Sequence, residues 1–306
     1  MSGWLPLALT GPVLWAVSTH IDKYLVDRYF SNSDTAVLMV FTALLSVILL
    51  VPIGLLVHGV FDVQLRDIAV LSASGALYMG AMLFYLRAIQ GDEASVVATL
   101  FQASTLFTFL FAYLFLGERL GARQLGGSAL IIFGALMISF DVANSRGWRV
   151  RLVLLMLACT AVLAASTIIF KFFAVRDEFW RTTFWMYVGE VAFGVVILAI
   201  PHYRKQFFAL LRKRTGAVLG VNGANELINL GGTLGVRLAL TMAPAALVAA
   251  ISSTTPLFVF VIGTALSMFA PRWSREDLSR RALTQKAIAS VIMATGVALC
   301  ADAHNV

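Results

Sequence analysis

Polar residues gather in one apolar stretch, Val218–Leu240, which is long enough to span a bilayer as a helix of about 20 residues. Its middle carries Asn222, Asn225, Glu226 and Asn229, and their spacing of i, i+3, i+4 and i+7 places them on one helix face. A carboxylate at membrane depth costs about 3 kcal/mol or more, so this face should point into the protein or a wet cavity. The pattern predicts one wall of a substrate path, with a seam of interhelical hydrogen bonds as the alternative.

Further polar residues could extend this path. Arg237 lies near the end of the same predicted helix, and Thr183, Tyr187 and Glu190 share one face of another apolar segment. Acidic, amide and basic groups near the midplane suit a zwitterion such as an amino acid. A carboxylate there can also bind and release protons during transport. For Glu190, a structural hydrogen bond is an equally open interpretation.

Two lysines, Lys23 and Lys171, lie near the far ends of their apolar segments. They could form gates or anion contacts on opposite sides of a cavity, or they could simply extend to lipid headgroups.

Three more residues are candidates for a cavity wall. Tyr78 and Tyr85 are seven residues apart on one predicted helix face, which fits an aromatic wall and a packing seam equally well. Gln102 shares a face with Ser95 and Thr99 and could contact a substrate.

Composition identifies the class of protein that holds these residues. The 306-residue chain is 60% hydrophobic and only 13% charged, whereas soluble domains are about 25% charged. It is therefore expected to be a polytopic membrane protein. No phosphate-binding loop, zinc motif, redox cysteine pair or dinucleotide fingerprint occurs, so we expect no cofactor, no metal and no enzymatic activity. The net charge of +7 lies mostly in loops and indicates membrane orientation rather than nucleic-acid binding.

Ten apolar segments can be counted, and only helices can satisfy their backbone groups in lipid without a closed barrel. The predicted fold is therefore an all-α membrane protein with ten transmembrane helices. The segments are 4–23, 35–57, 68–90, 94–116, 122–140, 150–173, 182–201, 215–240, 244–269 and 284–302.

The chain repeats itself. Residues 18–24 align with 166–172, and residues 94–98 align with 245–249. This predicts two five-helix halves, 1–145 and 146–306. Because five is odd, the second half should be inverted relative to the first, as in many secondary transporters with a site at the midplane.

Most of the 23 Lys and Arg residues fall at one set of segment ends, which should be cytoplasmic. This places both termini outside a cell inner membrane that the chain crosses repeatedly. Because the N-terminus lacks a basic region, we expect no cleavable signal peptide. The basic and apolar stretch 203–214 could be a helix in the membrane interface or a charged loop.

Several short motifs resemble the EamA-type transporters of the drug/metabolite transporter superfamily over nearly the whole chain. They are Trp15-Ala16 with Lys23 in the first span, residues 88–98 and 239–249 around the third and eighth, Leu116-Gly117-Glu118-Arg119-Leu120 after the fourth, Gly126, Gly127 and Gly134 in the fifth, and Pro256 in the ninth. The chain departs from this pattern at Thr105, the counterpart of Pro256, and in the second half, which lacks the Leu-Gly-Glu motif.

The resemblance implies alternating access around a central cavity, with Trp15 among its candidate lining residues. The third, fourth, eighth and ninth spans would line the cavity, and the fifth and tenth would be peripheral and could join two copies into a homodimer.

Taken together, these patterns predict a secondary transporter that exports a small polar metabolite, amino-acid-like or amphipathic, with protons as a possible coupling ion and lipids as its surroundings. The alternatives are an organic-phosphate exchanger that uses Lys23, Lys171 and Arg237 as anion clamps, and a lipid scramblase-like membrane protein.

Overall fold

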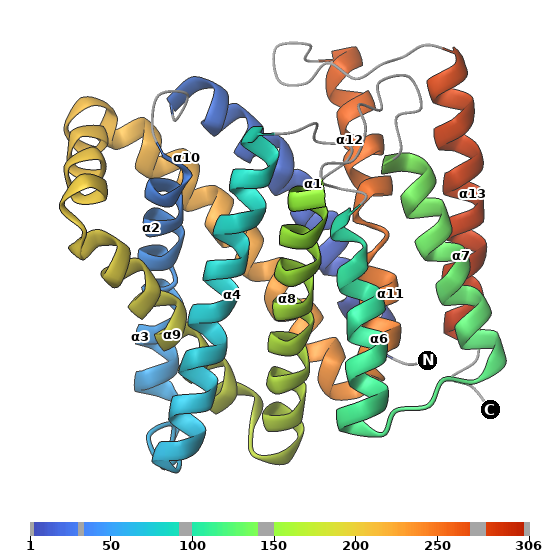
Figure 1. The fold of residues 1–306 in the computed structure, drawn as a ribbon, viewed down its shortest axis with the longest axis horizontal. Helices are drawn as coiled ribbons and strands as arrows, with labels where there is room; N and C mark the ends of the chain where they lie inside the picture. The colour runs from blue at the N-terminus through green and yellow to red at the C-terminus, as the bar shows by residue number, and fades with distance from the viewer. Residues whose placement is uncertain (1–2, 30–33, 92–99, 140–149, 270–279, 303–306) are drawn as a thin grey trace.

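The computed structural model describes residues 3–29, 34–91, 100–139, 150–269 and 280–302, which form a bundle of helices without a strand in these ranges (Figure 1). The all-α prediction is therefore confirmed for this part of the chain. The helices are α1 (Trp4–Tyr29), α2 (Thr35–Leu45), α3 (Val47–Leu56), α4 (Leu65–Gly91), α6 (Ala103–Leu116), α7 (Ala122–Ser139), α8 (Val150–Arg176), α9 (Phe179–Ala199), α10 (Pro201–Met242), α11 (Ala245–Ser252), α12 (Thr255–Phe269) and α13 (Arg280–Asp302).

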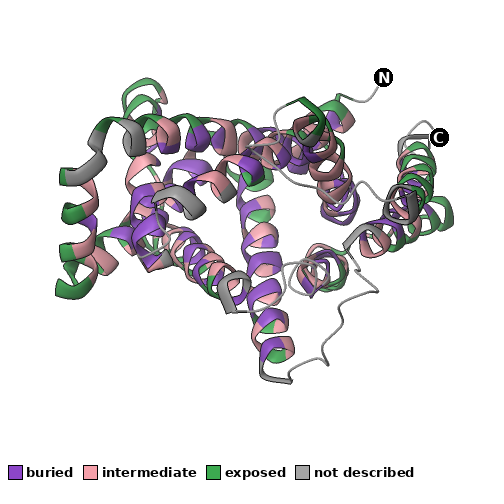
Figure 2. Ribbon diagram, turned by 90° about the horizontal axis from the view of Figure 1, so that it is seen from above, coloured by how far each residue is buried: buried purple, intermediate pink, exposed green. Residues whose placement is uncertain are grey.

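Five stretches of the described chain are long and apolar enough to cross a membrane: Ala36–Leu56, Leu65–Ala88, Leu152–Arg176, Phe179–Ala199 and Ala245–Leu266. Three shorter apolar helices accompany them: Ala103–Leu116, Ala122–Met137 and Thr284–Cys300. The count of ten crossings and the inverted duplication stay predictions. In the view along the bundle, buried residues face inward and exposed ones cover the outer surfaces (Figure 2).

Two predicted spans are interrupted in the structure. The segment 35–57 is divided into α2 and α3 at Ser46. The segment 244–269 is divided into α11 and α12 just before Pro256, whose missing N–H cannot continue the helical hydrogen bonds. Hydroxyl groups compensate there, since Thr255 Oγ1 donates to the Ser252 carbonyl over 2.7 Å and Thr254 Oγ1 to the Ile251 carbonyl over 2.7 Å.

The stretch 203–214 is helical, because it belongs to the 42-residue helix α10, and the loop interpretation is wrong. Its apolar residues at i, i+3 and i+4 pack on α1 and α2: Phe207 is buried, and its ring centroid lies 4.5 Å from that of Phe41. In Figure 1 this first part of α10 rises at the left, and the helix then turns and runs diagonally across the bundle.

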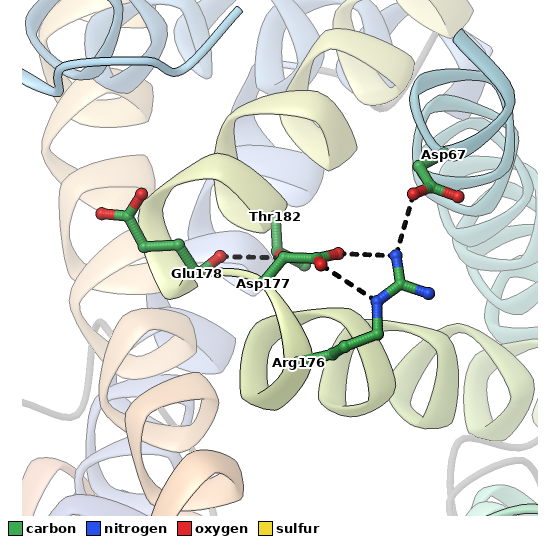
Figure 3. A network of polar contacts seen from close by, with 5 residues as sticks. All are labelled: Asp67, Arg176, Asp177, Glu178 and Thr182. Atoms are coloured by element: carbon green, nitrogen blue, oxygen red, sulfur yellow. Dashed lines mark hydrogen bonds and ion pairs between the residues drawn. The ribbon is translucent and has the colours of Figure 1, made fainter. Parts of the chain in front are cut away.

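One end of the bundle carries the connections 57–64, 117–121, 177–178 and 243–244 together with both termini, and we call it the Glu118 end (Figure 1). Ion pairs tie its helices together. Arg176 donates to Asp67 on α4 and to Asp177 after α8, each over 2.8 Å (Figure 3). Thr182 Oγ1, in the first turn of α9, donates to the Glu178 carbonyl over 2.8 Å (Figure 3).

Helices α4 and α9 approach each other through two glycines. A Cβ at Gly189 would overlap the carbonyl oxygen of Ser72, and a Cβ at Gly75 would overlap that of Met186. Small residues allow such close backbone contact between membrane helices. The contact brings the polar face of α9 toward the centre of the bundle.

Gly189→Ala is expected to force α4 and α9 apart and to lower the midpoint of thermal unfolding in detergent, a destabilisation of about 1–3 kcal/mol. The matched control is Gly126→Ala, because a Cβ there would meet no atom within 4 Å. Equal unfolding midpoints for the two variants would contradict this account of the contact.

Candidate functional site

Helices α1 and α10 pack against each other and carry several of the buried polar residues of the bundle, among them Ser18, Asn225 and Arg237. Neither is among the five stretches that qualify as membrane spans by hydropathy. A Cβ at Gly235 of α10 would overlap Thr10 Oγ1 of α1, so the two helices are in close contact. Their polar side chains are thus held away from lipid.

A first group of residues, the arginine cluster, consists of Arg237, Glu190, Tyr187, Thr183 and Phe170. The Arg237 guanidinium carbon lies 4.7 Å from the Tyr187 ring centroid and 5.1 Å from that of Phe170. Its Nη2 lies 3.4 Å from Glu190 Oε1, and both side chains are less than a tenth exposed. A charge-assisted hydrogen bond is usually 2.7–2.9 Å long, so this pair is loose.

Three polar atoms of the arginine cluster have no hydrogen-bond partner among the residues that the structure describes: Arg237 Nη1, Tyr187 Oη and Thr183 Oγ1. Each belongs to a buried side chain. A buried polar atom without a partner costs about 1–3 kcal/mol. One guanidinium nitrogen and two hydroxyls in this state can all donate hydrogen bonds, and they match the oxygens of an anionic group such as a carboxylate.

A second group, the aspartate cluster, consists of Asp22, Ser18, Asn225, Asn222 and Glu226. Asn225 Nδ2 donates to Asp22 Oδ1 over 2.6 Å, and Ser18 Oγ lies 3.4 Å from Asp22 Oδ2. Glu226 is buried, with Thr42 and Asn229 within hydrogen-bonding reach. No Lys or Arg whose side chain the structure describes forms an ion pair with either carboxylate.

The aspartate cluster also contains unpartnered polar atoms. Asn225 Oδ1 and Asn222 Nδ2 are buried and have no hydrogen-bond partner among the described residues. Two carboxylates and an amide oxygen together match a cationic or hydrogen-bond-donating group. This cluster therefore complements the arginine cluster in charge.

Both clusters lie on one face of α10. Glu226 and Arg237 are eleven residues apart, which is about three turns and about 16 Å along the axis. Tyr78 on α4 lies within electrostatic range of Glu190, Arg237 and Glu226. The predicted polar face of α10 is thus extended by residues of α1, α4 and α9.

The remaining predicted site residues take other places. Tyr85 packs on Phe101, with 4.7 Å between ring centroids, and Gln102 is buried at the N-cap of α6. Trp15 contacts α10 at Gly232. The Lys23 side chain lies outside the described part.

Lys171 belongs to neither cluster. It lies at the Glu118 end, where its Nζ is 2.5 Å from Glu118 Oε1.

Asp22 and Phe170 were not among the residues predicted for the site. Asp22 follows Ser18 by one helical turn, and this i, i+4 polar pair in an apolar segment is the signal that could have identified it. Nothing in the sequence singles out Phe170 from the other aromatic residues. Groups of three or more His, Cys, Asp or Glu that could hold a metal are absent from the described residues.

The interruption between α11 and α12 is in contact with the start of α6. Thr105, in the first turn of α6, and Ser253, between α11 and α12, share a hydrogen bond of 2.6 Å and are both buried. Interrupted helices commonly meet at transporter binding sites, because they expose backbone groups and allow movement.

Comparisons with known proteins agree with this architecture. Residues 2–140 match the model of the EamA-like transporter family. A crystal structure described only as that of a protein is similar, with a TM-score of 0.70 and 15% sequence identity over 98% of this chain and 96% of that chain. At this identity the likeness shows the fold alone. No curated protein matches the chain.

Proposed function

Because residues 2–140 match the model of the EamA-like transporter family, we propose that this multi-pass membrane protein is a secondary active transporter that exports a small polar metabolite by alternating access. The family consists of transporters and not of enzymes. The substrate, the direction and the mechanism are our proposal.

One observation carries the proposal: the arginine cluster and the aspartate cluster, both on one face of α10, hold buried polar atoms without partners in the described chain. A structural seam would leave few such atoms, because each costs free energy. A substrate that supplies the missing partners offsets this cost. An anionic group would bind at Arg237 and a cationic group at Glu226 and Asp22. Because the two clusters lie apart along α10, the best match is a zwitterion whose charges are well separated, such as an amino acid with a basic side chain.

The carboxylates that no described side chain neutralises suggest how transport is driven. Glu226 and Asp22 can be neutralised either by the cationic group of a substrate or by protons. If the two compete, a proton gradient drives export. Membrane-buried carboxylates serve as proton relays in many pumps and transporters for this reason.

A groove on the outside of the bundle favours a second candidate, the movement of lipids. It has a volume of about 480 Å³ and is lined by Phe84, Arg87, Leu154 and Leu155, where α4 and α8 lie side by side. Phe84 and Leu154 are exposed, so the groove opens sideways.

Homodimer formation is a further proposal. Helices α7 and α13 pack closely on each other at one side of the bundle (Figure 1). Their outward faces expose Leu125, Phe133, Ile288 and Val291, through which two copies would associate.

Counterflow into liposomes that contain the purified protein tests the function. We expect exchange of labelled amino acids, with accumulation when a pH gradient is applied. Exchange of sugar phosphates alone would instead support an anion exchanger that uses Arg237 and the lysines. If neither amino acids nor sugar phosphates are exchanged and a fluorescent phospholipid moves between the leaflets, the lipid candidate replaces the metabolite proposal.

A further inference from the structure

A carboxylate and a lysine join three helices at the Glu118 end. Lys171 Nζ, on α8, lies 2.5 Å from Glu118 Oε1 and donates to the Ala243 carbonyl over 2.6 Å. The other carboxylate oxygen, Glu118 Oε2, accepts the backbone N–H of Ala245 over 2.7 Å. Both charged side chains are only 13% exposed, so solvent screens the pair little.

Local sequence positions each member of this network. Gly117 adopts the left-handed conformation, with φ of +65°, which ends α6 and turns the chain so that Glu118 N–H reaches the Ala112 carbonyl. Pro244 begins the turn before α11, whose first amide is left free for a side-chain acceptor. The partial positive charge at the N-terminus of α11 further stabilises the Glu118 carboxylate at this place.

The network spans the two halves of the chain. Glu118 follows α6, whereas Lys171, Ala243 and Ala245 belong to α8 and to the connection between α10 and α11. The arginine cluster lies on the same helices or beside them: Arg237 precedes Ala243 on α10, and Phe170 is the neighbour of Lys171 on α8. A movement that opens the arginine cluster toward this end by separating α6 from α11 would break the network.

The corresponding positions of the opposite half cannot make the same network. The repeat pairs Lys171 with Lys23, but it pairs Glu118 with Phe269, which has no charge. Among the side chains that the structure describes, a carboxylate that bridges a lysine and a helix N-terminus is found at the Glu118 end alone. This asymmetry favours the state in which the Glu118 end is closed.

We propose that Glu118 and Lys171 form the gate of the transport path at the Glu118 end. The proposal rests on the transporter function proposed above. The pair holds α6 against the start of α11 in the resting state, and it separates when substrate is released at this end. Glu118 and Lys171 are positioning residues, since they act through the helices and not by touching the substrate.

Cysteine labelling in lipid nanodiscs tests the gate without any transport assay. The background is Cys159→Ser with Cys300→Ala, which removes the two native thiols. Thr183→Cys then reports access from the Glu118 end, and Ser18→Cys reports access from the opposite end. Both positions are buried, and a bulky charged maleimide is the probe.

Glu118→Gln is expected to raise the labelling rate at position 183 about tenfold or more and to lower the rate at position 18, because hydrogen bonds to a charged group are lost. Lys171→Met should act in the same direction. Arg119→Gln is the matched control, since it removes a charge from the same connection at an exposed side chain. It should leave both rates unchanged.

Two results would overturn the gate. Unchanged rates at position 183 in both variants would show that the pair does not control access. Increased rates at both positions would show general loosening of the bundle and a purely structural pair. The labelling rates at positions 183 and 18 could change in opposite directions while no amino acid or sugar phosphate is exchanged in counterflow. This outcome would retain the gate and reject the proposed metabolite transport.

Discussion

Arg237→Gln is expected to abolish amino-acid counterflow, because it removes the only cation of the arginine cluster within the described chain. Two effects contribute. The substrate loses the donor that matches its anionic group, and Glu190 is left buried without its cationic partner. Breaking a buried ion pair by removing one member destabilises a protein by about 3–5 kcal/mol, so the fold is affected as well.

A second substitution separates these two effects. Adding Glu190→Gln to Arg237→Gln removes the uncompensated charge and should restore much of the lost thermal stability without restoring counterflow. Arg237→Lys should also fail, since an ammonium group cannot reproduce the planar guanidinium that lies between Tyr187 and Phe170. The control is Arg176→Gln, which removes an exposed arginine at the Glu118 end and should leave counterflow intact. Normal counterflow in the double variant would rule out substrate binding at Arg237.

Glu226→Gln is expected to eliminate accumulation driven by a pH gradient while exchange of substrate continues at a reduced rate. Glutamine keeps the shape and hydrogen-bonding reach toward Thr42 and Asn229 but cannot take up a proton. The measurement compares gradient-driven uptake with counterflow in the same liposomes. This result would show that coupling to protons requires the Glu226 carboxylate, whereas substrate binding depends on it only in part.

The control for this prediction is Glu178→Gln, which changes a carboxylate at the start of α9 that pairs with Arg181 near the surface. The Glu178→Gln variant should accumulate substrate under a pH gradient to the same extent as the unsubstituted protein. If Glu226→Gln and Glu190→Gln both accumulate substrate normally under a pH gradient, neither carboxylate is the coupling group.

Part of the site could be predicted because it depends on local order along the chain. The spacing of Asn222, Asn225 and Glu226 places them on one face of any helix, and the cost of a charge in lipid turns that face inward. In the structure all three are buried. The same reasoning placed Thr183, Tyr187 and Glu190 on one face of α9, where Tyr187 and Glu190 contact Arg237.

The interruption at Ser46 and the joining of 203–214 to α10 were not evident from the same patterns. At Ser46 the chain lacks a glycine or proline that would mark a break, and the apolar run continues across it. In the stretch 203–214 the alternation of basic and apolar residues permits a loop or a helix. Burial of Phe207 against Phe41 decides for the helix, and that contact joins residues far apart in the chain.

Composition and periodicity by themselves determined that this protein is an α-helical membrane protein and which helix faces are polar. Only the tertiary structure decided the partners: Arg237 with Glu190, Asn225 with Asp22, and Glu118 with Lys171. The physical reason is that a periodic pattern describes one helix and carries no information on its neighbours. Between apolar helices in lipid, the hydrophobic effect does not favour one neighbour over another, so packing and a few polar contacts make the choice.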